Sequence, residues 1–159
     1  MADYLVKLYD IPSLTPFLEK TNNNGITIRR PIGPENYAVS SWIKENFSTL
    51  WAGEAENAFF RSPKSIFIAI NDSTNEMLGF ACYDATTKGF FGPTGVSSEA
   101  RGTGIGSALL MASLHAMHDE GYGYAIIGGV GPAEFYEKIC GATLIEGSGH
   151  SVYKGMLFP

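Results

Sequence analysis

The stretch from Gly95 to Ser107 contains the residues best suited to binding an anionic ligand. It reads Gly-Val-Ser-Ser-Glu-Ala-Arg-Gly-Thr-Gly-Ile-Gly-Ser, with every second residue from 102 to 106 a glycine. Glycine permits positive φ and has no Cβ, so successive backbone N–H groups can converge on one ligand. Apolar periodicity predicts a helix over residues 104–120, whose N-terminus adds unpaired donors and partial positive charge. These features predict a diphosphate site with Arg101 at its mouth.

Two other glycine-rich phosphate motifs do not fit this stretch. A nucleotide P-loop ends in Gly-Lys-Ser/Thr, but here Gly106 is followed by Ser107 and then Ala. The dinucleotide fingerprint needs Gly or Ala three residues after its second glycine, where this chain has Ser107 or Leu109. The pattern that fits is Arg/Gln-x-x-Gly-x-Gly/Ala, which begins at Arg101 and ends at Gly106.

The surrounding elements follow from hydrophobic periodicity and turn residues. Residues 1–25, interrupted by prolines and closed by Asn-Asn-Asn-Gly, are expected to form an N-terminal arm before one domain over residues 26–159. A bulge or splay is expected at Gly92-Pro93, because proline cannot donate to a ladder. The order of strands and helices along the chain predicts a single α+β, or mixed α/β, domain. Strands are expected at 26–30, 66–70, 77–83, 89–96, 124–130, 143–145 and 151–157, and helices at 34–47, 51–60, 104–120 and 132–139.

Composition narrows the class of protein. A chain of 159 residues with 45% hydrophobic and 17% charged residues can bury a core as one domain. The net charge of −5 argues against a nucleic-acid platform. We expect Cys82 and Cys140 to be free thiols, because a disulfide scaffold needs more cysteines. We expect no metal. With neither a signal peptide nor an apolar run near the roughly 20 residues of a membrane span, a cytoplasmic protein without membrane contact is expected.

From about Ile26 onward, and most strongly over residues 89–141, the chain resembles the GCN5-related N-acetyltransferase (GNAT) family. The resemblance rests on the Arg101–Gly106 motif, the strand before it, the amphipathic helix after it, the apolar strand 124–130, and Phe-Tyr-Glu-Lys at 135–138. It implies a central, mostly antiparallel sheet, flanked by helices, whose strands 89–96 and 124–130 part to admit the pantetheine arm of acetyl-CoA. Val96 would offer its backbone to the pantetheine amides. The pyrophosphate would bind to Arg101, Gly102, Thr103, Gly104, Ile105, Gly106 and Ser107.

Tyr136 occupies the family position of the general acid. Attack of an amine on the thioester expels a thiolate whose conjugate acid has a pKa of about 8.5. A phenol with a pKa of about 10 is protonated at neutral pH and can donate as the C–S bond breaks. Many relatives have an asparagine seven residues before this tyrosine, where the chain has Gly129.

The base and the acceptor pocket are less clearly marked. The strand 89–96 has no carboxylate, so Asp84 is the first candidate for the base. The other titratable candidates are Glu54, Glu56, Glu134 and His150. The segment 47–61 is where the family builds its acceptor pocket, so it would be lined by Trp51, Glu54 and Glu56, whose acidity favours a cationic amine.

The predicted function is therefore acetyl transfer from acetyl-CoA to a primary amine of a small molecule or peptide, by direct attack, in a monomer or homodimer. Two alternatives stay open: a CoA-binding module without turnover, and an interaction domain that binds no CoA. Tyr136 favours the enzyme, whereas the absence of an evident base favours the module.

Overall fold

The sheet is built around a hairpin of β3 (Ile66–Asn71) and β4 (Met77–Tyr83), in a computed structural model that describes residues 1–157. On one side β2 (Ile26–Arg29) pairs with β3, and on the other β5 (Phe90–Val96) pairs with β4, all antiparallel. Strand β6 (Tyr124–Ile127) is parallel to β5, and β1 (Tyr4–Lys7) lies antiparallel between β6 and β7 (Thr143–Leu144). Within residues 1–157 these seven strands form one sheet in the order β2-β3-β4-β5-β6-β1-β7.

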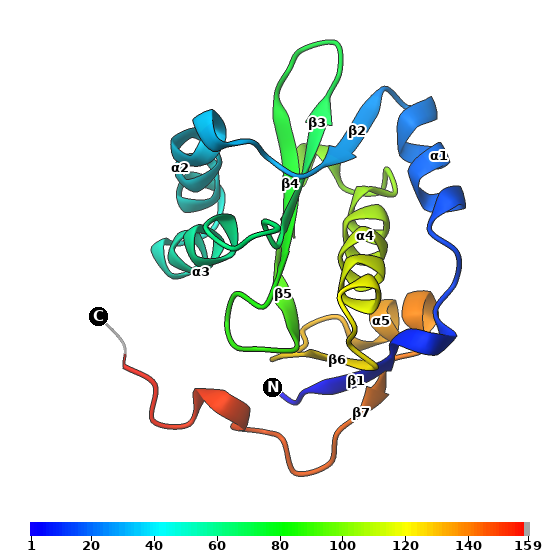
Figure 1. The fold of residues 1–159 in the computed structure, drawn as a ribbon, viewed down its shortest axis with the longest axis vertical. Helices are drawn as coiled ribbons and strands as arrows, with labels where there is room; N and C mark the ends of the chain where they lie inside the picture. The colour runs from blue at the N-terminus through cyan, green and yellow to red at the C-terminus, as the bar shows by residue number, and fades with distance from the viewer. Residues whose placement is uncertain (158–159) are drawn as a thin grey trace.

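Helices cover both faces of the sheet (Figure 1). Helices α2 (Asn36–Asn46) and α3 (Thr49–Phe59) lie on one face. Helices α1 (Thr15–Asn23), α4 (Ile105–Asp119) and α5 (Ala133–Cys140) lie on the other. Short 3-10 turns are η1 (Leu8–Asp10), η2 (Gly33–Glu35), η3 (Ser98–Ala100) and η4 (Ser151–Tyr153). This arrangement confirms the predicted mixed α/β domain with a mostly antiparallel sheet.

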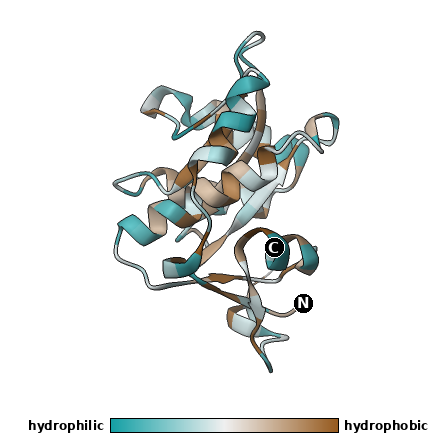
Figure 2. Ribbon diagram, turned by 90° about the vertical axis from the view of Figure 1, so that its right-hand side faces the viewer, coloured by the Kyte–Doolittle hydropathy of each residue, from teal (hydrophilic) through white to brown (hydrophobic). Residues whose placement is uncertain are grey.

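Side chains of β4 alternate between two cores. Ala81 and Tyr83 pack with α4, whereas Phe80 and Cys82 pack with α2 and α3. This is the period-2 pattern of a strand buried on both faces. Figure 2 shows the hydrophobic residues gathered in the central strands and helices, with hydrophilic residues in the outer loops.

Aromatic rings fill the core beneath α2 and α3. Phe47 lies between Trp51 and Phe80, with ring centroids 5.1 and 5.9 Å away. Its ring rests directly on β5, because a Cβ at Gly95 would lie only 2.3 Å from Phe47 Cζ. Gly95 therefore permits this helix pair to approach the strand closely.

The structure near both ends of the chain differs from what the sequence pattern predicts, an N-terminal arm at one end and a strand at the other. Within the expected arm, β1 pairs with two strands, Val6 is fully buried, and α1 packs on α4. The predicted strand at 151–157 is wrong: residues 151–153 form η4, and positive φ at Ser151 and Gly155 interrupts an extended backbone. The end of the expected domain, residues 158 and 159, lies outside the described residues.

No helix among residues 1–157 is both long and apolar enough to cross a membrane.

Candidate active site

Strands β5 and β6 part after a short parallel contact. Their pairing ends with Phe91 opposite Ile127, where β6 stops. Strand β5 continues to Val96, and among the described residues it pairs there only with β4. The Ser97 N–H donates to Leu78 O at 2.8 Å, so Ser97 directs its N–H toward β4. Successive strand residues direct their backbone groups to opposite sides. The N–H and C=O of Val96 therefore face away from β4, toward the gap that opens between β5 and β6.

The gap begins where β5 is irregular. Between Phe91 and Thr94 the register with β4 shifts, so that Gly92 and Pro93 stand opposite a single residue. The bulge expected at this dipeptide is confirmed, and it increases the local twist of β5.

The loop between β5 and α4 presents backbone donors. Gly102 and Gly104 have φ of +81° and +85°, values that residues with side chains rarely adopt. The Thr103 hydroxyl donates to Ala100 O at 2.6 Å and so fixes the turn. Helix α4 begins at Ile105, and the N–H groups of its first turn have no intrahelical acceptor. The loop and helix start together form a donor-rich site suited to an anion.

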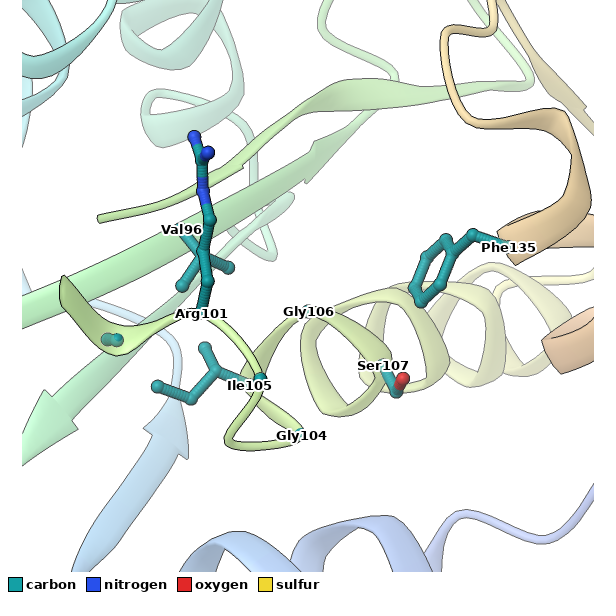
Figure 3. A pocket seen from close by; sticks show the side chains of 9 residues that line it. Val96, Arg101, Gly104, Ile105, Gly106, Ser107 and Phe135 are labelled. Atoms are coloured by element: carbon teal, nitrogen blue, oxygen red, sulfur yellow. The ribbon is translucent and has the colours of Figure 1, made fainter. Parts of the chain in front are cut away.

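A cleft of about 220 Å³ opens beside this loop (Figure 3). Val96 and Phe135 stand on either side of Gly106, where a Cβ would lie 3.8 Å from Val96 Cγ2 and 4.0 Å from Phe135 Cζ. The missing side chain at 106 therefore keeps a narrow slot open. Of the residues predicted to bind the donor, all but Thr103 line the cleft: Val96, Arg101, Gly102, Gly104, Ile105, Gly106 and Ser107.

Two cationic side chains stand near the loop. Arg101 is exposed and extends away from the start of α4 (Figure 3). Lys20 of α1 reaches the loop from the other side, with Cδ, Cε and Nζ at 3.1, 3.2 and 3.4 Å from the position of a Cβ on Gly104.

Tyr136 lies where the two strands part. Its ring packs edge-on against Phe91, with centroids 6.3 Å apart, and against Phe135 at 5.0 Å. The side chain is buried, and among residues 1–157 no protein group hydrogen-bonds to its hydroxyl. Burial, assisted by the neighbouring Cys140, raises the pKa of Tyr136 to about 12. The phenol is therefore a free donor that stays protonated well above neutral pH.

Asp84 is enclosed by structural partners. One oxygen accepts the Gly89 N–H at 2.6 Å, and the other accepts the Tyr122 hydroxyl at 2.7 Å. Arg61 Nη1 lies 3.0 Å from the latter oxygen, at ion-pair distance but without hydrogen-bond alignment. Both carboxylate oxygens thus hold the β4–β5 turn and the end of α3 together, and the side chain is only 3% exposed.

Glu54 lies in a different polar group, on the α3 face. It accepts a short hydrogen bond from the Thr86 hydroxyl. Tyr153 lies close to Thr86 and Glu54, and burial raises the pKa of this phenol. Its oxygen would lie 2.9 Å from a Cβ on Gly128, the residue that follows β6. Glu54, Thr86 and Tyr153 are all half-buried.

The remaining candidates are dispersed. Trp51 is part of the aromatic core, and Glu56 is exposed and accepts from Ser40 on α2 at 2.8 Å. Glu134 and His150 are exposed, on α5 and before η4. The structure thus separates Glu56 from Glu54, although both lie on α3.

Both cysteines are free and buried. Burial raises the pKa of Cys140 to about 11, and Cys140 Sγ donates to Tyr136 O at 3.2 Å. Burial also raises the pKa of Cys82. Both are therefore protonated thiols at neutral pH, and neither has the character of a nucleophile. No three His, Cys, Asp or Glu side chains among residues 1–157 are grouped to hold a metal ion.

Gly129 is bound by a residue that the sequence pattern did not indicate. Its N–H donates to Asp3 Oδ1 at 3.1 Å, and Ser151 donates to the other oxygen of Asp3. At this position, where many GNAT proteins have asparagine, the backbone is tied to the N-terminal segment.

Sequence reasoning missed Asp3, Lys20, Thr86 and Tyr153. Asp3, Lys20 and Tyr153 reach the site from distant parts of the chain, whereas Thr86 lies in the β4–β5 turn, and no local spacing connects any of them with the glycine-rich loop. Phe135 is a residue that the sequence could have placed at the cleft, because it precedes Tyr136 on a short helix.

Residues 36–142 match the acetyltransferase (GNAT) family over more than half of the chain. The chain belongs to the GNAT family. No curated protein matches its sequence.

Solved GNAT structures share the fold. The glucosamine N-acetyltransferase region of a fungal multi-domain GH3 β-N-acetylglucosaminidase aligns with a TM-score of 0.74 and 14% identity over 91% of this chain and 19% of that one. A GCN5-related N-acetyltransferase from Sphaerobacter thermophilus aligns with a TM-score of 0.64 and 21% identity, over 91% of this chain and 48% of that one. A tandem GNAT protein from the clavulanic acid biosynthesis pathway aligns with a TM-score of 0.57 and 18% identity, over 90% of this chain and 49% of that one. The chain thus spans from about a fifth to about half of these proteins.

Proposed function

We propose that this GNAT protein transfers an acetyl group from acetyl-CoA to a primary amine. One observation carries the proposal: the unpaired edge of β5 leads from Phe91, on which Tyr136 packs, to the donor-rich loop at the start of α4. A pantetheine arm has amides that suit the backbone of Val96, and a pyrophosphate suits the loop. The cleft between Val96 and Phe135 fits a narrow chain passing over Gly106.

In the proposed reaction the amine nitrogen attacks the thioester carbonyl carbon, the C–N bond forms and the C–S bond breaks. Tyr136 donates a hydrogen bond to the sulfur as it gains negative charge. With a Tyr136 pKa of about 12, complete proton transfer to a thiolate of pKa about 8.5 would be uphill by roughly 5 kcal/mol. Tyr136 therefore acts as a hydrogen-bond donor to the leaving thiolate and keeps its proton, and the thiolate is protonated from solvent after it leaves.

Glu54 is better placed than Asp84 to take the proton of the amine. The two oxygens of Asp84 are occupied by Gly89 and Tyr122, whereas Glu54 is linked through Thr86 to the parting of the strands. Since Thr86 donates to Glu54, a proton that reaches the Thr86 oxygen can be passed on to the carboxylate. Tyr136 approaches from the α4 face and this group from the α3 face, so acid and base would flank the reacting carbon.

The acceptor would be a small amine that approaches from the α3 face, where Glu54 provides negative charge for a cationic group. Glucosamine is a suitable first acceptor to assay, because the fungal region of similar fold is described as a glucosamine N-acetyltransferase.

Binding of acetyl-CoA should be tested first, by calorimetry. Gly106→Glu places a carboxylate in the slot at a residue without positive φ, and should weaken binding more than about tenfold. Gly123→Glu is the charge-matched control, since Gly123 is exposed, has open space around it and follows α4 at its other end. Wild-type protein that binds no acetyl-CoA would overturn the proposal.

Turnover is then followed as thiol release with glucosamine and a panel of other primary amines. Tyr136→Phe should lower kcat roughly 100-fold or more while leaving the affinity for acetyl-CoA within about twofold. Acetyl-CoA binding without turnover on any amine would favour the non-catalytic CoA-binding module.

A further inference from the structure

Lys20 occupies an unusual position for a cation. Its side chain crosses from α1 to the start of α4, and the last three side-chain atoms lie within 3.4 Å of the position that a Cβ on Gly104 would take. Helix α1 packs beside α4, so this approach is a consequence of the helix pair (Figure 3). Any side chain at 104 would meet the Lys20 stem, so Gly104 leaves room for it.

The electrostatic environment there is unfavourable for an ammonium group. A helix N-terminus carries partial positive charge and unpaired N–H donors, both of which repel a cation. Within residues 1–157 no carboxylate lies within ion-pair distance of Lys20, so no protein charge compensates this repulsion. Lys20 is exposed to solvent in the free protein, so its ammonium is available to an anion bound at the loop.

We propose that Lys20 binds the pyrophosphate of CoA, so that α1 supplies a cation to a site whose other donors come from the β5–α4 loop. This inference rests on the proposed function. The Lys20 ammonium lies next to Gly104, beside the loop whose backbone N–H groups are available to an anion, and this suits a diphosphate with charge on both phosphorus centres. Arg101, which extends the other way, is left to contact the outer part of the ligand.

The proposal gives the N-terminal segment a role in the site. The segment before residue 26 is anchored by β1 in the sheet and by α1 on α4. The backbone of Lys20 is thus fixed on a packed helix, so less backbone entropy is lost on binding than for a lysine on a free tail.

The test compares Lys20→Met with wild type by calorimetry against CoA and against 3′-dephospho-CoA. Methionine retains the apolar stem and removes the charge. We expect about fivefold to tenfold weaker binding, the range for a partly exposed charge-assisted hydrogen bond. The loss should be the same for both ligands, because both contain the pyrophosphate. Lys20→Arg should restore most of the affinity, and Lys44→Met, which removes an exposed lysine from α2 on the opposite face, should leave it unchanged.

A second measurement separates ligand binding from a structural role. Without ligand, Lys20→Met should unfold at about the same temperature as wild type, because Lys20 is exposed and makes no ion pair among residues 1–157. With saturating CoA it should gain less thermal stability than wild type. A lower unfolding temperature of the free variant, with unchanged CoA affinity, would overturn the proposal.

Two further outcomes separate a failure of the pyrophosphate assignment from a failure of the proposed function. A loss of affinity for CoA but not for 3′-dephospho-CoA would overturn the assignment to the pyrophosphate. If wild-type protein binds no CoA, the proposed function fails, and the diphosphate site is then tested with inorganic pyrophosphate. Pyrophosphate binding that Lys20→Met weakens would support the site, and no pyrophosphate binding would overturn it.

Discussion

At the scale of single residues, Tyr136 combines a buried ring with a free hydroxyl. The ring packs against Phe91 and Phe135, and no protein group among residues 1–157 hydrogen-bonds to the hydroxyl. The hydroxyl oxygen is not one of the buried side-chain atoms that lack a partner, so it retains contact with solvent. It is therefore available to donate to a ligand where β5 and β6 part.

The raised pKa of Tyr136 predicts the alkaline side of the activity profile. Its pKa of about 12 means that the protonated phenol, the form required for donation, persists as pH rises toward that value. We therefore expect kcat not to fall between pH 8 and 10.5. The measurement is a pH–rate profile with acetyl-CoA and an accepted amine, with Tyr136→Phe as the control for other titrating groups. Loss of half the wild-type kcat near pH 10, absent in the variant, would contradict the prediction.

At the scale of elements, Arg29 and Glu35 connect β2 to the turn that starts α2. The guanidinium donates to both carboxylate oxygens, at 2.8 and 2.7 Å, and Glu35 also accepts the Ile32 N–H. These hydrogen bonds, with Arg29 the leading cause, lower the pKa of Glu35 to about 2. The pair therefore fixes where α2 begins relative to the sheet.

This pair predicts a pH-dependent contribution to stability. Because the pKa of Glu35 is depressed on folding, its stabilisation is present above the unfolded value of about 4.5 and is lost as pH falls toward 2. Solvent screening limits it to about 0.5–1 kcal/mol. Urea unfolding should show wild type more stable than Glu35→Gln by that amount at pH 7, with the difference shrinking through pH 4 to 2. A difference independent of pH would assign the effect to packing instead.

The elements that sequence predicted well are those stabilised by near neighbours. The hairpin of β3 and β4 and helix α4 fall within one residue or so of the expected bounds, because periodicity, a turn and a terminal glycine all act locally. Residues 101–107 were also identified locally, since the anion site is one continuous loop. Strand β1 could not be predicted, because its partners are β6 and β7, more than a hundred residues away. The same applies to Lys20, Asp3 and Tyr153, which reach the site only through the fold.

At the scale of the whole molecule, β1 is an inner strand next to one edge of the sheet. It lies between β6 and β7, and Val6 packs in the core of α4 with no exposed surface. A segment appended to an independent domain would contribute little to its unfolding, whereas an inner strand belongs to the same cooperative unit.

Val6→Ala tests this directly. Removing two buried methyl groups should lower the free energy of unfolding by about 2 kcal/mol, with one transition and an unchanged urea m-value. Lys7→Ala, in the same strand but exposed, should change it by less than about 0.5 kcal/mol. A Val6→Ala effect as small as that of Lys7→Ala would mean that the segment is not part of the cooperative core.

The position of β1 also determines when the sheet can be completed during synthesis. Tyr4 leaves the ribosome well before its partners Ile127 and Leu144. Long-range pairing of this kind slows folding, because a large loop must close before the contacts form. Strands β2 to β5 and helix α4 can assemble first, while β1 has two unpaired edges, a state prone to aggregation. The interval between the synthesis of β1 and that of β7 is therefore when this domain should depend most on chaperones.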